Sequence, residues 1–263
     1  MKIFFDGPLN PKMLSMIPKN FAVVNSKEEA DLILDTSNTE KSFKNLLNVT
    51  SFLYELIGKF VEPEVLESIL KEKSLPEPCI KEIGVAFIDI RGFTRYANKT
   101  SPQKVFQILQ DFASESEETI LFYGGQIDKY IGDCAMAIWT NPENYQDPTG
   151  VFIKAIITLF HKIKNKFEAE NLSCGAGLNI GKALIGFAGS NTMLDFTAIG
   201  HTVNIAARLE SVARSWEIAF PYKLLRDSQF LKTLPVQHEV VDVKGSPEPI
   251  EIGIVNAEYI KLQ

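Results

Sequence analysis

The stretch VAFIDIRGFT, residues 85–94, decides how the central part of the chain folds. Its run of apolar residues predicts a buried strand, Asp89 stands near the end of that strand, and Gly92 predicts a turn. A carboxylate at this place lies at a sheet edge, where the backbone N–H groups of residues 90–94 can face an anion. Taken alone, such an aspartate is more often a simple turn cap.

A second stretch, DKYIGDCAMAIW at residues 128–139, predicts a β-hairpin. Two largely apolar strands, over 126–131 and 134–139, flank Gly132-Asp133, a dipeptide typical of tight hairpin turns. If the hairpin lies beside the first strand, Asp133 and Asp89 converge, and two close carboxylates favour a divalent metal between them. Asp133 on its own is also compatible with an ordinary hairpin turn.

A third stretch, DFTAIGHTVNIAARLES at residues 195–211, predicts a strand followed by a helix over 202–213. Asn204 and Arg208 are four residues apart on this helix, so the amide and the guanidinium project from one face. Arginine is well suited to a phosphate, and asparagine can orient a ribose oxygen. The same spacing is common on plain helix surfaces.

Outward from these stretches, helices and strands alternate through residues 79–263, which we predict to form one domain. Its fold class is α+β, with one mixed, mainly antiparallel sheet flanked by helices. Two more helices are predicted, from Ser101-Pro102 to Gly124-Gly125 and over 151–167. Further strands are predicted at 174–180, 183–188, 196–199 and 218–220, and at 239–243 paired with 250–255.

The sequence of the N-terminal part predicts two smaller structural segments. Residues 1–40 are a small α/β unit, too short for an independent core. Its predicted elements are strands at 2–5, 21–24 and 31–34 and a helix at 11–17. Residues 41–78 are a helical stalk and linker whose apolar stripe, interrupted by Pro63, indicates buried core, a dimer contact or a signal-transmitting element.

Composition excludes several classes of protein. The 263 residues are 45% hydrophobic, which argues against disorder, and 27 Lys and Arg against 33 Asp and Glu give a net charge of -6. An acidic chain without a basic block is a poor nucleic-acid binder. No apolar run reaches the roughly 20 residues of a transmembrane helix. Three cysteines without metal-type spacing predict reduced thiols and a cytoplasmic protein.

The three quoted stretches, in this order, resemble the signature segments of the class III nucleotidyl cyclase catalytic domain. The resemblance covers about residues 80–256, and FVEPEVLESIL (60–70) is similar to the segment that often precedes that domain. The family implies a ferredoxin-like, palm-type domain. It also implies that Asp89, Ile90 and Asp133 hold two Mg²⁺ (or Mn²⁺) ions.

The resemblance assigns the remaining site residues as well. Lys129 and Thr197 match the pair that reads the base, and Asn204 and Arg208 match the pair that orients the ribose and stabilises the transition state. The resemblance further implies substrate contacts by the turn residues Ile90, Gly92, Phe93 and Thr94 and by Lys244. Two positions depart from the pattern: Ser246 replaces a frequent basic residue, and His201, where Asp or Asn is frequent, is interpreted as a helix-start residue.

The base-reading pair favours adenine, because a lysine ammonium donates to N1 and a threonine oxygen accepts from the amino group. The implied enzyme is an adenylate cyclase that converts ATP to cyclic AMP and pyrophosphate. In this family the two halves of each site come from different subunits, which implies a head-to-tail homodimer, with residues 1–78 open to a regulatory partner or ligand. The alternatives are a catalytically silent nucleotide-binding or dimerisation module, a guanylyl cyclase, and an unrelated α+β phosphotransferase.

Overall fold

The structure is a computed structural model that describes residues 2–6, 17, 22–23, 26, 28, 32–35, 40–58, 63–190, 193–242 and 248–262. The chain divides into two compact units. The smaller unit comprises residues 1–78 and 186–196, and the larger unit comprises residues 79–185 and 197–263. No helix among the described residues is long and apolar enough to cross a membrane.

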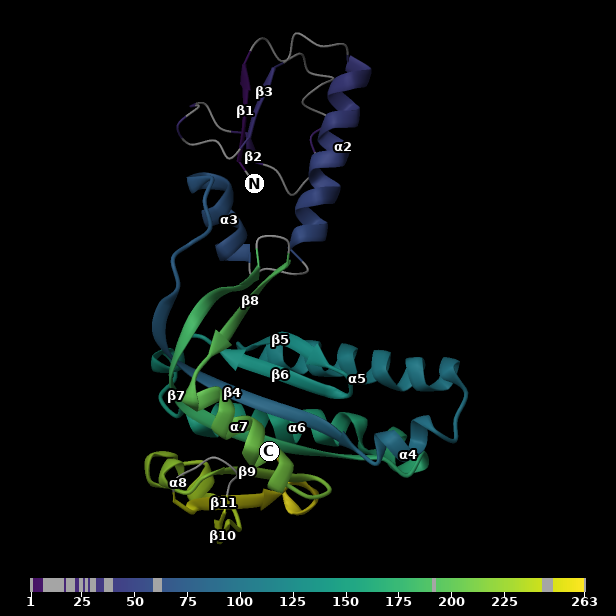
Figure 1. Cartoon of the computed structure of the whole chain (residues 1–263), viewed down its shortest axis with the longest axis vertical. Coiled ribbons are helices and arrows are strands. Elements are labelled where there is room, and N and C mark those ends of the chain that lie inside the picture. Colours follow the sequence, from purple (N-terminus) through teal and green to yellow (C-terminus); the bar gives the residue numbers. More distant parts are fainter. Residues whose placement is uncertain are drawn as a thin grey trace. The chain divides into compact units, whose positions relative to one another are not determined.

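The smaller unit contains a three-stranded parallel sheet in the order β2-β1-β3 (Figure 1). Its elements are β1 (Lys2–Asp6), β2 (Ala22–Val23), β3 (Leu32–Asp35), α2 (Glu40–Ile57) and α3 (Pro63–Glu72). The three predicted strands are therefore confirmed, whereas the helix predicted over 11–17 falls largely outside the described residues. On α2, Leu47 is buried, but Phe52 and Leu53 on the predicted apolar stripe are exposed.

The larger unit is built on a mixed sheet with the strand order β10-β11-β9-β7-β4-β6-β5, with β8 paired to β7. Its strands are β4 (Cys79–Arg91), β5 (Gln126–Ile131), β6 (Cys134–Trp139), β7 (Ser173–Ser190), β8 (Met193–Ile199), β9 (Glu217–Pro221), β10 (Gln237–Val241) and β11 (Ile250–Asn256). The pair β7–β9 is parallel, and β4 runs antiparallel to both of its neighbours. The predicted α+β class with a mainly antiparallel sheet is confirmed.

Helices cover both faces of this sheet (Figure 1). They are α4 (Phe93–Ala97), α5 (Pro102–Phe122), α6 (Pro148–Ala169), α7 (His201–Val212) and α8 (Lys223–Asp227). Successive residues of β9 pack on opposite faces of the sheet, because successive side chains of a strand point to opposite sides. Phe220 belongs to the main core, to which α5 and α6 contribute, whereas Ala219 packs in a second cluster with Leu209 of α7.

Asp147 ties the start of α6 to a distant loop. Its Oδ1 accepts a hydrogen bond from Gly150 N at 2.8 Å, which caps the helix. Its Oδ2 accepts from Ser228 Oγ at 3.0 Å and from Phe230 N at 2.9 Å. One carboxylate therefore fixes the N-terminus of α6 and the segment after α8 together.

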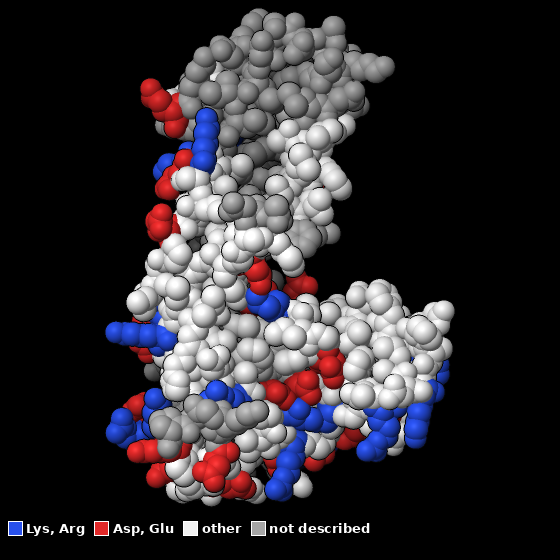
Figure 2. All heavy atoms as spheres, in the orientation of Figure 1, with Lys and Arg blue, Asp and Glu red and all other residues white. Residues whose placement is uncertain are grey.

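Charged side chains on α6 form ion pairs rather than one continuous charged surface. Lys162 Nζ lies 3.4 Å from Glu115 and 3.3 Å from Glu118 on α5, and Lys164 Nζ lies 2.7 Å from Glu258. Figure 2 shows acidic and basic side chains intermixed over the visible face of the larger unit. These exposed pairs contribute little stability individually.

Two predicted boundaries are wrong. Residues 174–188 form one long strand rather than two, since no residue from 181 to 183 has a positive φ and the backbone stays paired with β4 through this region. The predicted turn after Arg91 continues into the short helix α4, because Gly92 at φ 85° turns the chain and Phe93 then starts a helix.

Candidate active site

The end of β4 and the β5–β6 turn lie side by side. Asp89 is paired with Cys134 in the antiparallel ladder, and Ile90 N donates to the Asp133 carbonyl oxygen at 3.3 Å. Gly132 has a φ of 65°, which glycine tolerates and which the tight turn requires. Both carboxylates line one hollow of about 480 Å³.

The same hollow gathers most residues of the predicted metal and phosphate site. Its lining also includes Ile90, Gly92, Phe93 and Thr94 from the end of β4 and the start of α4, together with Arg91 and Arg95. The structure thus brings together all the predicted residues of the first two sequence stretches except Lys129.

Arg91 is a member of this site that the sequence reasoning missed. Its Nη1 lies 2.8 Å from Asp89 Oδ1 and 2.5 Å from Glu210 Oε1. Its Nη2 donates to the carbonyl oxygens of Glu210 and, at 2.9 Å, of Ala213, both at the end of α7. Because residues two apart on a strand share a face, the alternation of β4 could have indicated Arg91 beside Asp89; Glu210 gave no such signal.

Glycine at position 175 makes room for the guanidinium. A Cβ atom there would lie 2.5 Å from Arg91 Nη2, so any other residue would displace the guanidinium from this position. Gly175 is the direct β7 partner of Asp89. The absence of a side chain at this position of β7 therefore lets Arg91 reach from β4 to α7.

The electrostatics of the hollow favour a cation. Burial, the largest cause, together with the negative charges of Glu210 and Asp133 raises the pKa of the Asp89 carboxyl to about 6, against the opposing effect of Arg91. Within the described ranges, no cluster of three or more His, Cys, Asp or Glu side chains could hold a metal. Two carboxylates completed by substrate phosphates are a usual Mg²⁺ environment, so the residues fit such an ion.

The predicted base-reading residues form a second group. Thr197 Oγ1 donates to Asp128 Oδ2 at 2.8 Å, and Lys129 Nζ lies 3.4 Å from the same oxygen. Thr197 is almost fully buried, and the Lys129 side chain is about one-quarter exposed. The structure therefore links Lys129 on β5 to Thr197 on β8 through Asp128, a residue that the sequence reasoning did not single out.

The third predicted pair lies on α7. The start of this helix is fixed to β7, since Thr202 Oγ1 donates to Lys182 O at 2.7 Å and Asn179 Nδ2 donates to Thr202 O at 3.1 Å. Asn204 is exposed and Arg208 is partly exposed. Among the described residues the Arg208 guanidinium forms no ion pair.

A close approach of β7 and α7 sets the position of this pair. A Cβ atom at Gly177 would lie 2.0 Å from Glu210 N and 2.2 Å from Ala206 O. Only glycine therefore permits the backbone of α7 to rest on the strand. His201 is exposed at the first position of the helix, whereas Lys244 lies outside the described residues.

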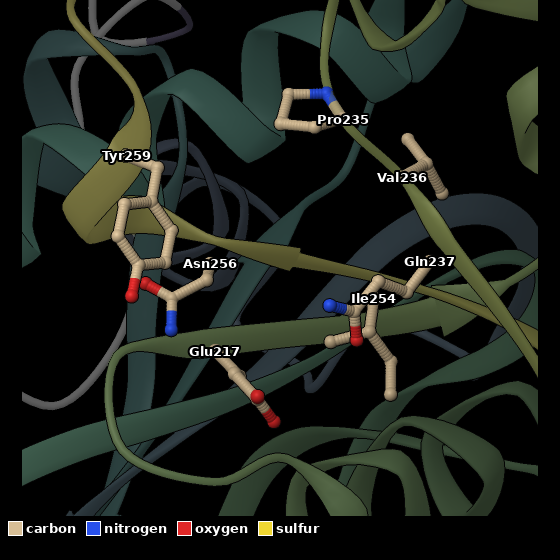
Figure 3. A pocket seen from close by; sticks show the side chains of 7 residues that line it. All are labelled: Glu217, Pro235, Val236, Gln237, Ile254, Asn256 and Tyr259. Carbon is tan, nitrogen blue, oxygen red and sulfur yellow. The ribbon is translucent and has the colours of Figure 1, made fainter.

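A separate hollow of about 380 Å³ contains no predicted site residue. Glu217, Asn256 and Tyr259 gather on one side of it, opposite Val236 and neighbouring residues (Figure 3). The Glu217 carboxylate already accepts a hydrogen bond from Arg214 N at 2.8 Å. This hollow lacks the paired carboxylates and the glycine turn of the first one, so the first hollow is the candidate active site.

Comparisons with known proteins identify the family of this chain. The family model of the adenylate and guanylate cyclase catalytic domain matches residues 75–254. An adenylate cyclase of Anabaena cylindrica is 27% identical over 90% of this chain and 48% of its own length. The terminal-differentiation-specific adenylate cyclase of Dictyostelium discoideum is 30% identical over 69% of this chain. The chain spans 9% of the Dictyostelium protein, so it corresponds to part of these relatives.

Solved structures give the same result. The adenylyl cyclase CyaB from P. aeruginosa is 27% identical, with a TM-score of 0.62 over 72% of this chain and 98% of that one. A bacterial light-regulated adenylyl cyclase shares the fold at a TM-score of 0.69 and 24% identity, over 87% of this chain and 68% of that one. The guanylyl cyclase Cya2 shares it at 0.62 and 22% identity, over 68% and 94%. The chain belongs to the adenylate and guanylate cyclase catalytic-domain family, the class III nucleotidyl cyclases.

Proposed function

We propose that this chain is an adenylyl cyclase that converts ATP to 3′,5′-cyclic AMP and pyrophosphate. The observation that carries the proposal is the hollow shared by Asp89 and Asp133, where burial and like charges raise the pKa of Asp89. A site that disfavours its own negative charge is suited to bind cations. In a cyclase domain, this is the place for metal-bound phosphates.

Adenine is the base that the second group suits. The Lys129 ammonium only donates hydrogen bonds, which matches the N1 acceptor of adenine, and Thr197 can accept from the exocyclic amino group. Guanine presents a donor at N1 and an acceptor at O6, so it would face this pair with the wrong polarity. GTP is therefore the disfavoured substrate.

The predicted site residues have different roles in an in-line displacement at the α-phosphorus of ATP. Class III cyclases generally use divalent metals, and two Mg²⁺ or Mn²⁺ ions bound by Asp89, Asp133 and Ile90 would supply Lewis-acid activation of the 3′-hydroxyl and charge neutralisation. Asn204 orients the ribose, and Arg208 stabilises charge that develops at the α-phosphate, which is worth about 3 kcal/mol. The N–H groups of residues 91–94 and Lys244 bind phosphates, whereas the N–H group of Ile90 is already bonded to the carbonyl oxygen of Asp133.

A head-to-tail homodimer would complete each site. Among the residues that line the acidic hollow, none belongs to the base-reading or ribose groups. The larger unit also exposes large apolar side chains on α5, β5 and β8, with Phe122 83%, Leu121 67%, Ile131 55% and Ile199 50% exposed. Apolar surface of this kind favours burial against a second copy.

We assign the binding of a regulatory partner or ligand to residues 1–78, which precede the catalytic domain over 79–263. Rotation of one subunit against the other would misplace half of each site, and a 1 Å error can lower the rate by about 10²-fold. The three free cysteines fit a reducing compartment, and we place the reaction in the cytoplasm.

Subunit mixing tests both the activity and the shared site. We expect purified protein to form cyclic AMP with Mg²⁺ or Mn²⁺, and Asp89→Ala and Arg208→Ala to be inactive separately. Their mixture recovers about one quarter of wild-type activity, because about half of the dimers are mixed and each mixed dimer holds one intact site. The matched control mixes Asp89→Ala with Asp133→Ala, which damage the same half and recover nothing.

Three results would contradict the proposal. Product from GTP alone would identify a guanylyl cyclase. Absence of any product from a confirmed dimer would indicate a silent nucleotide-binding module. No recovery in the first mixture, despite subunit exchange, would exclude the composite site.

A further inference from the structure

Asp128 is a buried carboxylate between the two residues that read the base. Its side chain is only 2% exposed, although it stands on a strand whose neighbouring residue Tyr130 is exposed. The ladder between β5 and β6 shifts at this position, since Ile127 pairs with Ala137 but Lys129 pairs with the adjacent Met136. Asp128 is thus the extra residue of a β-bulge.

The bulge has a consequence for side-chain direction. In a regular strand Asp128 and Lys129 would point to opposite faces. A bulge breaks this alternation and re-aims a side chain. Here it lets the Asp128 carboxylate and the Lys129 ammonium come within 3.4 Å of each other, while the same oxygen accepts from Thr197 at 2.8 Å.

The hydrogen bond from Thr197 decides what this hydroxyl can offer to a ligand. A threonine hydroxyl has one proton and two lone pairs, so it can normally donate or accept. An ionised carboxylate can only accept, and therefore the proton of Thr197 Oγ1 is committed to Asp128. The lone pairs of Oγ1 remain, so Thr197 can offer a ligand only an acceptor.

We propose that Asp128 is a positioning residue that sets nucleobase specificity by making Thr197 an obligate acceptor and holding Lys129 as the adjacent donor. This inference rests on the proposed cyclase function. An acceptor beside a donor matches the amino group and N1 of adenine. It opposes a 6-oxopurine, whose O6 needs a donor and whose N1 carries a proton. Without Asp128, Thr197 could rotate its hydroxyl and donate to O6.

The test compares ATP with inosine triphosphate, which has the 6-oxo group and N1–H of guanine without its 2-amino group. In Asp128→Asn the side-chain amide can donate to Thr197 and release its proton. We expect the ratio of kcat/KM for ATP to that for inosine triphosphate to fall at least about tenfold. In a Thr197→Val background, the same substitution should change the ratio by a much smaller factor, because only the contact of Asp128 with Lys129 is then lost.

Asp111→Asn is the matched control. Asp111 also carries a mostly buried carboxylate paired with a lysine, Lys166, but it lies on α5 and takes no part in the site. The ratio should stay at its wild-type value in this variant. If Asp128→Asn fails to fold, Asp128→Ser tests the same point, because serine is also uncharged and can donate to Thr197.

The inference is overturned if Asp128→Asn lowers kcat/KM for both nucleotides by the same factor, as a purely structural role would. If wild-type protein makes cyclic AMP but Asp128→Asn keeps the wild-type ratio of kcat/KM values, the role of Asp128 is refuted while the proposed function stands. If wild-type protein makes no product, equilibrium binding of ATP and inosine triphosphate gives the same ratio. A folded variant that keeps the wild-type preference in binding would then refute the role of Asp128.

Discussion

Replacing Asp89 by asparagine should stabilise the metal-free protein at neutral pH while abolishing cyclase activity. Asp89 is half-buried near Glu210 and Asp133, and its pKa is raised from 3.8 to about 6. A shift of about 2 units corresponds to about 3 kcal/mol for a fully buried group. Because this carboxyl is partly exposed, solvent screening reduces the expected gain to about 1–2 kcal/mol.

The sign follows from proton linkage. The folded state holds the Asp89 proton more tightly than the unfolded state does. Proton binding at Asp89 therefore adds its full contribution to the free energy of unfolding of the wild type below pH 4. That contribution is lost as the pH rises through about 6. Asp89→Asn does not titrate. The difference between variant and wild type should therefore be smallest near pH 4 and reach its full value above pH 7.

Tryptophan fluorescence during urea unfolding measures this difference in the presence of a chelator. Both tryptophans, Trp139 and Trp216, are buried in the larger unit, so the signal reports on the unit that contains Asp89. Asp227→Asn, which changes an exposed carboxylate, should show no such pH-dependent gain. The reasoning is refuted if Asp89→Asn is less stable than wild type at pH 8, or if its effect is the same at every pH.

Two further predictions concern the scaffold and use the same unfolding assay. Asp147→Ala should cost about 3 kcal/mol, because it removes the acceptor of three hydrogen bonds and leaves the N–H of Phe230 without its partner; a loss below 1 kcal/mol would contradict this role. Gly177→Ala should also cost about 3 kcal/mol and lower activity, since its Cβ would collide with the backbone of α7. Gly132→Ala, with a φ of 65° and no atom within 4 Å of its Cβ, should cost only about 1 kcal/mol; equal effects at Gly177 and Gly132 would argue against close packing as the cause.

Much of the fold was readable from local sequence. The hairpin over 126–139 has the predicted strands and turn, because two apolar segments joined by Gly132-Asp133 leave few other conformations. The predicted pairing of strands at 239–243 and 250–255 is confirmed as that of β10 with β11, although β10 begins and ends two residues earlier. The single long β7 was missed, since a glycine inside an extended strand resembles a turn when the strand's partner is unknown.

The site was predictable where a residue type and a turn occur together, as at Asp89 and Asp133. The residues that support it were not. Arg91 and Glu210 are 119 positions apart and meet only because β7 brings α7 against β4. Asp128 depends on a bulge, and a shift in strand register leaves no trace in the amino-acid pattern of one strand. Long-range contacts of this kind require the tertiary structure.

The guanidinium of Arg91 serves as a resident counter-ion for an otherwise acidic centre. It offsets part of the mutual repulsion among Asp89, Glu210 and Asp133 before any nucleotide arrives. The larger unit therefore neutralises part of this acidic centre with a side chain of its own. Under the proposed function, cations that enter the hollow compete with this internal positive charge, which lowers the affinity of the site for them.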